Sequence, residues 1–364
     1  MIGLKKLDWY IIRRFMLTFF AAILFIIVIV IIFDLSEKID DFVKREAPLH
    51  AIVFDYYLNF IPYFMNMYSQ LFVFITVIFF TSRLAANSEI IAILSCGVSF
   101  QRMMVPYIIS AVLIALLSLS LSLFVIPHAN VERIAFEQKY VRHYGRPEQA
   151  LRDIHYKLND STLVYIESFS TWNNTAYNFT LEQLGTDKLV RKLSAESAQW
   201  DSTSASWQLH NWFDRIYGDG LQDRVKSGRQ KDTTLSLTVD DFYRNKRTVE
   251  RLNRRELNEL IKVQKERGDK MVMYSEVEKH TRLALPFSAI ILTIMGVCLS
   301  SKKRRGGTGW NIALGLALGF SYVLFMKFSQ MFVATDTLSP AMALWLPNMI
   351  YALIAAVIYR LAPK

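Results

Sequence analysis

The chain has 364 residues, of which 52% are hydrophobic, and its formal net charge is +10. A positive charge of this size would suit a nucleic-acid-binding protein, but many of the basic residues adjoin long apolar runs, where they indicate a membrane surface. The two cysteines, Cys96 and Cys298, lie far apart in the sequence, which excludes a disulfide framework and a cysteine-based metal cluster.

Long apolar runs occupy both ends of the chain. A membrane core about 30 Å thick is crossed by roughly 20 apolar residues in a helix, which satisfies its own backbone hydrogen bonds. Six runs meet that length: Phe15–Phe33, Phe60–Thr81, Val105–Ile126, Leu283–Ser301, Trp310–Val333 and Ala343–Leu361. The sequence therefore predicts three membrane-spanning helices at each end of the chain.

Basic residues collect on one side of these predicted spans. The segment before the first span, the loops after the second and fourth spans, and the C-terminal tail all carry lysine or arginine. The loop over residues 34–57, on the other side, holds six acidic and three basic residues. Because basic loops stay in the cytoplasm, both termini are predicted to be cytoplasmic, and the polar insert lies beyond the opposite face of the membrane.

The loop between the second and third spans contains a candidate for a short helix. Ser88 could cap a helix over Glu89–Ser95, Glu89 would suit its first turn, and Gly97 could end it. Its isoleucines favour a position along the membrane or in the groove of a partner. The residues leave open whether this helix docks a partner or only lies at the membrane surface.

The polar insert changes its periodicity along its length. Residues 131–145 are predicted to extend the third span as a helix or to form a short connecting helix. Short runs of alternating apolar and polar residues follow, separated by turn residues, which predicts β-strands. The predicted strands are Ile154–Leu158, Thr162–Glu167, Thr175–Leu184, Leu189–Trp200, Ser206–Tyr217 and Thr233–Val239. An amphipathic helix that begins near Glu256 leads back to the membrane.

These elements predict an α-helical membrane protein with six transmembrane helices in a 3+3 arrangement and an inserted extracytoplasmic all-β, jelly-roll-like domain. Residues 1–126 hold the first three spans, with the loop helix at about 84–98. Residues 127–281 form the insert, with its β-domain at about 150–245 and helical connectors. Residues 282–364 hold the last three spans.

Motifs of covalent chemistry are missing from the sequence. Residues 305–309 resemble a phosphate-binding loop but lack its lysine, the histidines show no paired ligand spacing, and no serine nucleophile elbow occurs. The chain is therefore predicted not to be an enzyme. A permease, a secondary transporter and a membrane-tethered binding protein remain, but a secondary transporter would need paired ionisable residues in its spans, where only Lys327 comes close.

Several motifs resemble those of a known permease family. The loop sequence Arg83-Leu-Ala-x-x-Ser-Glu89, followed by Ser95-x-Gly-Val-Ser99, resembles the coupling helix of the LptF/LptG (YjgP/YjgQ) family. Three further segments are similar to that family: Asp8-Trp-Tyr-Ile-Ile-Arg13, Leu285-Pro-Phe-Ser-Ala289 and Gly306-Gly-Thr-Gly309. The compact β-insert favours the G type of subunit over the F type.

The resemblance implies a permease subunit of an ATP-driven (ABC-type) exporter in the bacterial inner membrane. Such a subunit pairs with a paralogous permease and docks on an LptB-like cytoplasmic ATPase dimer. The complex extracts lipopolysaccharide and passes it through jelly-roll domains to LptC-like and LptA-like proteins, which form a bridge across the periplasm toward the outer membrane. ATP and magnesium would be used by the partner ATPase, so no cofactor is expected on this chain, and no nucleic acid is expected as a partner.

The resemblance also implies candidate site residues. Glu89 matches the acid of the coupling helix that contacts the ATPase, and Arg83 and Gly97 match positions that set the ends of this helix. Bases near the outer membrane surface are candidates for contacts with the lipid phosphates, in which arginine can act as a bidentate donor. These bases are Lys38, Lys44, Arg45 and Arg133. The alternative, that they only balance neighbouring acids, stays open.

Two features of the fifth span have open roles. Lys327 would either face the lipid cavity or extend its ammonium group to the membrane surface. Gly315 and Gly319 form a motif of small residues that lets helices approach closely. The family pairs its subunits through the first and fifth spans, so this motif is a candidate subunit contact, with packing inside one chain as the alternative.

Overall fold

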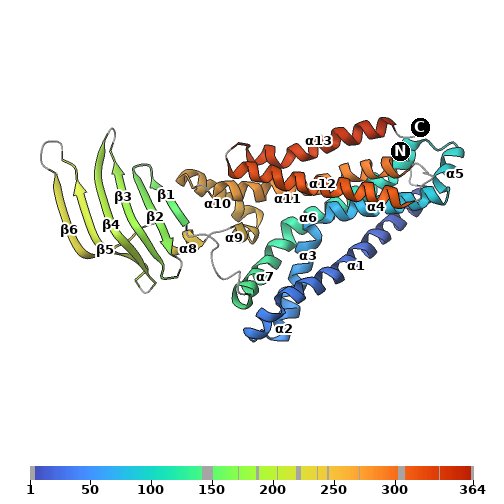
Figure 1. Ribbon diagram of the computed structural model, residues 1–364. Helices are drawn as coiled ribbons and strands as arrows, with labels where there is room; N and C mark the ends of the chain where they lie inside the picture. Colours follow the sequence, from blue (N-terminus) through green and yellow to red (C-terminus); the bar gives the residue numbers. More distant parts are fainter. Residues whose placement is uncertain are drawn as a thin grey trace. The chain divides into compact units, whose positions relative to one another are not determined.

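The protein divides into two compact units. The computed structural model describes residues 5–141, 151–170, 172–185, 188–202, 204–218, 223–235, 237–243, 246–269, 271–301, 308–335 and 337–361. One unit comprises Met1–Val141 with Glu276–Lys364, and the other comprises Arg142–Ser275. The first unit is helical and the second contains a β-sheet (Figure 1).

Within the described residues, six helices are long and apolar enough to cross a membrane. They are built from α1 (Lys6–Lys44), α4 (Ser69–Ala86), α6 (Phe100–Ser120) with its continuation α7 (Ile126–Tyr140), α11 (Val272–Ser300), α12 (Thr308–Ala334) and α13 (Pro340–Leu361). Shorter elements join them: α2 (Leu49–Ala51), the π-helical segment η1 (Ile52–Tyr57), α3 (Leu58–Met67), α5 (Glu89–Ser95) and the π-helical segment η2 (Leu121–Val125). The predicted 3+3 arrangement of helices around an insert is confirmed.

The first two spans differ from their predicted lengths. α1 runs for 39 residues, far beyond the apolar run at 15–33, because no glycine or proline interrupts the polar sequence on either side of that run. The second predicted span is instead divided into α3 and α4 at Tyr68, whose backbone leaves the helical region (φ −111°, ψ 10°).

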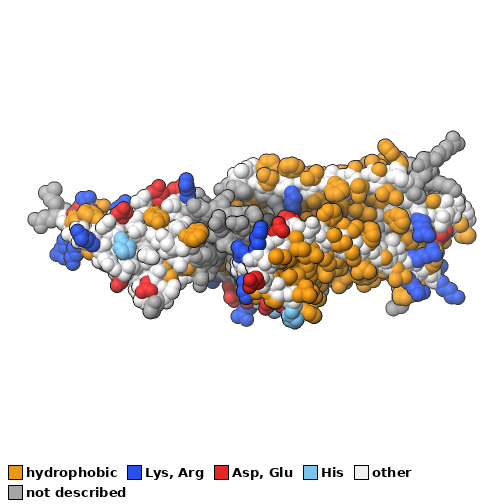
Figure 2. All heavy atoms as spheres, turned by 60° about the horizontal axis from the view of Figure 1, so that its bottom comes forward, with side chains coloured by type: hydrophobic (Ala, Val, Ile, Leu, Met, Phe, Trp, Pro, Cys, Tyr) orange, Lys and Arg blue, Asp and Glu red, His pale blue; other side chains and the backbone are white. Residues whose placement is uncertain are grey.

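The helical unit has an apolar core and an apolar surface. In the core, Phe15, Phe80 and Tyr107 from α1, α4 and α6 pack with ring centroids 6.0–6.1 Å apart. The outward side of α1 exposes large apolar side chains that include Leu24 and Phe25, and Figure 2 shows hydrophobic side chains gathered over the helices. Because so large an apolar surface is unfavourable in water, it fits contact with lipid or with other membrane helices.

In the described part of the second unit, the strands form one antiparallel sheet. Its strands are β1 (Leu151–Asn159), β2 (Thr162–Ser170), β3 (Thr175–Leu184), β4 (Leu189–Asp201), β5 (Ser206–Ile216) and β6 (Arg224–Thr233). Each strand pairs with the next along the chain, so the order in the sheet is the order in the sequence. The predicted all-β insert between the third and fourth spans is confirmed.

The last predicted strand is wrong. The sequence predicted a strand over Thr233–Val239, whereas β6 lies at Arg224–Thr233. Nearly all side chains of β6 are exposed, so this edge strand lacks the apolar alternation that marks a half-buried strand. Leu235 and Leu237 follow the strand and pack against the apolar side of the sheet.

Short helices follow the sheet. The first of them is α8 (Val239–Tyr243), from which Phe242 stacks on Phe169 with ring centroids 4.2 Å apart. Just before α8, the Leu237 carbonyl accepts a hydrogen bond from Trp207 Nε1 (2.7 Å). The helix α10 (Arg254–Arg267) follows α9 (Lys246–Glu250) and is capped by Asn253. The Asn253 side chain accepts from the Glu256 backbone N–H, and the Glu256 side chain accepts from the Asn253 backbone N–H. The aromatic residues of the strands therefore include members of a packed core.

Candidate functional site

The predicted coupling helix forms α5, between α4 and α6. It covers Glu89–Ser95, and Ser88 before it adopts a left-handed backbone conformation (φ 62°) without capping the helix through its side chain. The interpretation of Ser88 as a side-chain cap is therefore wrong. At the other end, the Gly97 N–H donates to the Leu94 carbonyl (3.0 Å), and Gly97 has φ +82°, a conformation that glycine adopts without strain.

Glu89 is held by residues from the start of α1. The Tyr10 hydroxyl donates to Glu89 Oε2 (2.9 Å), and Arg14 Nη1 donates to the same hydroxyl (2.5 Å) and lies 4.0 Å from Glu89 Oε1. The Glu89 side chain remains about one-third exposed, at 30%. The acid that the family resemblance assigns to partner contact is thus accessible and also connected to the first span.

A second contact joins α1 to the start of α6. Arg102 donates to both carboxylate oxygens of Asp8, at 2.7 and 2.5 Å, and Asp8 is only 2% exposed. Sequence reasoning missed this pair and the contact of Tyr10 with Glu89, because the partners lie 94 and 79 residues apart. Arg83, the third residue assigned to this region, is exposed in the last turn of α4.

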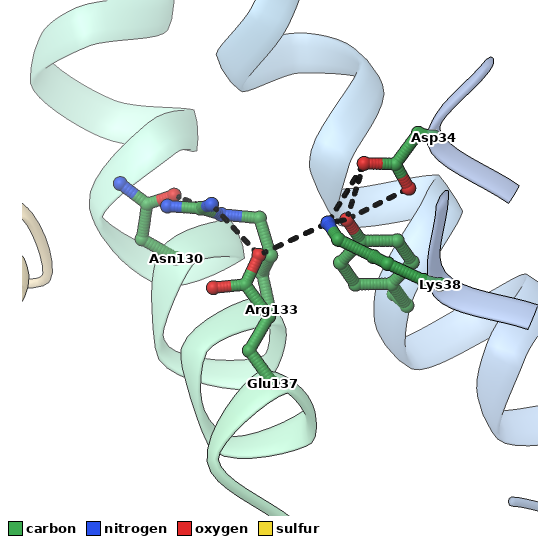
Figure 3. Close-up of polar contacts among 6 residues, drawn as sticks. Asp34, Lys38, Asn130, Arg133 and Glu137 are labelled. Carbon is green, nitrogen blue, oxygen red and sulfur yellow. Dashed lines mark hydrogen bonds and ion pairs between the residues drawn. The ribbon is translucent and has the colours of Figure 1, made fainter. Parts of the chain in front are cut away.

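The C-terminal part of α1 contributes to a buried polar cluster (Figure 3). Lys38 Nζ donates to Asp34 Oδ1 (2.7 Å) and also to the hydroxyl of Tyr56 from η1. The Tyr56 hydroxyl donates in turn to the Asp34 carboxylate, at 3.0 and 3.1 Å. Lys38 is only 7% exposed, so its charge is held inside the protein.

The other half of the cluster comes from α7. Arg133 Nε donates to Asn130 Oδ1 (3.0 Å) and its Nη1 donates to Glu137 Oε1 (3.3 Å), while Lys38 Nζ lies 4.0 Å from the same Glu137 oxygen. Figure 3 shows the side chains of α1 and α7 converging through this contact. Lys38 and Arg133, predicted separately, therefore meet in one site.

Aromatic rings enclose this site. Tyr56 packs against Phe42, Phe60 and Phe136 with ring centroids 5.2–6.0 Å apart, and the Arg133 guanidinium lies 4.1 Å from the centroid of Tyr63. Burial, followed by the negative charge of Asp34, raises the pKa of Tyr56 well above its usual value. The phenol therefore stays protonated and acts as a hydrogen-bond donor.

Sequence reasoning treated acids near Lys38 only as a possible charge balance, and it did not identify Glu137 or Tyr56 as members of this cluster. A signal was present, because Asp34 and Lys38, like Arg133 and Glu137, are spaced i,i+4 on a helix and so share a face. The alternative that the bases balance nearby acids holds for Lys38 and Arg133 in this structure. Phosphate contact by these bases stays a prediction.

The remaining predicted bases lie outside the buried cluster. Lys44 is exposed at the end of α1, and Arg45, also exposed, donates to the Lys139 carbonyl (3.0 Å). Lys327 lies on the exposed side of α12, next to the buried Met326. The structure thus brings Lys38 and Arg133 together but not Lys327, whose predicted role remains open.

The two glycines of α12 pack against α4 of the same chain. A Cβ atom at Gly315 would lie 2.0 Å from Ile78 Cδ1, and one at Gly319 would lie 2.9 Å from Leu71 Cδ1. This close approach is the packing inside one chain that was the alternative to a subunit contact. Because α4 occupies the glycine surface, that surface is not available to a second subunit in this arrangement.

These features define a polytopic membrane protein with an inserted β-sheet domain and a short loop helix connected to its first span. A family model described as lipopolysaccharide export system permease LptF/LptG matches residues 9–361. The chain belongs to this family and is a permease of the lipopolysaccharide export machinery, a multi-pass protein of the inner membrane. A search of individual curated proteins returned no match. The family model covers both types of subunit, so the G type stays a prediction.

Proposed function

We propose that this chain is the membrane subunit through which a separate cytoplasmic ATPase drives extraction of lipopolysaccharide. The observation that carries the proposal is Glu89, an accessible acid on α5 that is hydrogen-bonded to Tyr10 at the start of α1. An ATPase bound at α5 would therefore act on the first span directly. ATP and magnesium would belong to an LptB-like dimer, and this chain would hold no cofactor.

The proposed orientation places α5 and both termini in the cytoplasm and the β-sheet unit in the periplasm. Basic residues at the N-terminus and in the loops on the α5 side support it. The end of α13 supports it as well, because Tyr359 packs against Phe100 at the start of α6, with ring centroids 6.3 Å apart. The start of α1 and the end of α13 thus lie at the α5 end of the helices (Figure 1).

The proposed substrate contact lies at the opposite end of α1. There, Lys38 and Arg133 would meet the phosphate groups of lipopolysaccharide, with Lys44 and Arg45 as exposed bases on the same side. The apolar surface of α1 would accommodate the acyl chains, and a paralogous permease would complete the cavity. The β-sheet unit would pass the lipid to LptC-like and LptA-like bridge proteins.

Copurification tests this proposal. The tagged chain is purified from its native membrane in mild detergent, and the associated ATPase is measured for the wild type, for Glu89→Ala, and for Glu259→Ala as a matched exposed acid in α10. We expect an ATPase with the wild type and with Glu259→Ala, and a loss of assembly or of coupled activity with Glu89→Ala at unchanged expression.

Each alternative function corresponds to a different result. Absence of any ATPase from the wild-type preparation would contradict the exporter and favour a secondary transporter or a membrane-tethered binding protein. Normal assembly and activity of Glu89→Ala would instead show that the coupling contact lies elsewhere on the loop.

A further inference from the structure

Among the described residues of the buried cluster, the acidic and basic side chains balance in charge. Asp34 and Glu137 provide two negative charges, and Lys38 and Arg133 provide two positive charges, all on side chains with little exposure. The Tyr56 hydroxyl makes further hydrogen bonds with Asp34 and Lys38, and the Asn130 side chain accepts one from Arg133. An anion that reaches this site therefore meets bases that are already paired, so it must compete with acids of the protein.

Glu137 is the acid shared between the two halves of the cluster. The same oxygen lies 3.3 Å from Arg133 and 4.0 Å from Lys38, whereas Asp34 contacts only Lys38 of the two bases. Release of Glu137 would thus remove a negative charge that the bases of α1 and α7 share. A phosphate group carries about −1.5 to −2 charges near neutral pH and three strong acceptor oxygens, so it can take the place of a carboxylate between two bases.

The backbone near the cluster has unusual helical geometry on two sides. Tyr56 lies in the π-helical segment η1, and η2 ends at Val125, immediately before α7 begins. Short π-helical segments are rare and occur frequently at functional sites. A change from π-helical to α-helical hydrogen bonding in η2 would rotate the following helix by about 100° for each residue of register, which would separate Glu137 from Lys38.

We propose that Asp34 and Glu137 act as internal counter-ions that hold Lys38 and Arg133 until a phosphate group of the lipid displaces them. The inference rests on the proposed function, because it takes the phosphorylated glycolipid as the ligand. The acids hold the bases in position inside the protein when no lipid is bound. They also recapture the bases when the lipid leaves, and so prevent tight retention of the phosphate.

Binding of fluorescent lipopolysaccharide to the purified permease complex tests the counter-ions. Asp34→Asn removes a competing charge, so we expect several-fold tighter binding of lipopolysaccharide and slower release. Dephosphorylated lipopolysaccharide should bind Asp34→Asn and the wild type equally. Glu37→Gln is the matched control, because Glu37 is an exposed acid on the same helix next to Lys38, and it should leave binding unchanged.

A second variant keeps the test decisive if Asp34→Asn fails to fold. Glu137→Gln should also tighten binding of the phosphorylated lipid only. Unchanged or weaker binding in the folded acid variants would overturn the proposal, as would equal tightening for the dephosphorylated lipid.

Two variants of the bases separate this proposal from the proposed function. Lys38→Met and Arg133→Met should weaken binding of the phosphorylated lipid. If they weaken binding while the acid variants do not tighten it, the bases contact the lipid but the acids are not its competitors. If the base variants bind as the wild type does, the substrate contact in the proposed function is itself wrong.

Discussion

Lys38 and Lys44 lie on the same helix, yet the protein gives them different surroundings. Lys38 is buried and paired with Asp34, whereas Lys44 is exposed in the last turn of α1. Lys44 can therefore contact an anion without any rearrangement, while Lys38 becomes available only when its acid moves. The residue type and its place in the sequence predicted the same role for both, and burial distinguishes them.

Gly97 allows a residue-scale prediction about the end of α5. Its φ of +82° places any other residue under strain, although a Cβ atom there would meet no neighbouring atom within 4 Å. We expect Gly97→Ala to lower the free energy of unfolding by about 1–2 kcal/mol, the cost of a left-handed conformation, and to weaken the association of the ATPase. Gly309→Ala is the control, since Gly309 is helical with equally open surroundings, so no loss of stability is expected there. Equal effects of both variants would contradict the role of backbone strain.

At the scale of elements, α1 is the helix that links the two candidate sites. Near its start, Asp8 contacts α6 and Tyr10 contacts α5. The helix then continues without a break to Asp34 and Lys38. A helix of 39 residues is about 58 Å long at a rise of about 1.5 Å per residue. Movement of the coupling helix is therefore expected to shift the polar cluster through a single continuous element.

The Asp8–Arg102 pair should stabilise the α5 end of α1. Asp8→Asn leaves the Arg102 guanidinium without its bidentate carboxylate, so we expect a loss of about 1.5–3 kcal/mol in the free energy of unfolding. Unfolding in mixed micelles, followed by tryptophan fluorescence, measures this loss. The double exchange of Asp8→Arg with Arg102→Asp should recover part of the stability.

A structural effect and a coupling effect can be told apart for this pair. If α1 transmits movement of α5, Asp8→Asn should also reduce the stimulation of ATPase activity by lipopolysaccharide, while basal activity in the assembled complex is kept. Arg13→Gln, which removes an exposed arginine from the same end of α1, should change neither quantity. Normal stimulation in Asp8→Asn would limit the pair to stability.

At the scale of the whole molecule, the sequence predicted the fold better than it predicted the sites. The length of an apolar run indicates a membrane-spanning helix, and the six helices were predicted from such runs. Apolar residues at every second position indicate a strand, and the boundaries of β3 were predicted from that pattern. The polar edge strand β6 has no such pattern and was misplaced. The contacts of Tyr10, Asp8 and Glu137 depend on how distant helices pack, which local periodicity does not specify.

The membrane orientation of the whole protein can be tested with its own cysteines. Cys96 is exposed just after α5, whereas Cys298 is buried in the helical core. A membrane-impermeant maleimide should therefore label Cys96 in inverted membrane vesicles and leave it unlabelled when added from the periplasmic side. Cys298 should not react in either experiment. In a Cys96→Ser background, Trp172→Cys introduces a thiol at a turn residue of the β-sheet unit that is 84% exposed, and it should react only from the periplasmic side. Labelling of both positions from the same side would contradict the proposed orientation and the placement of α5 against a cytoplasmic ATPase.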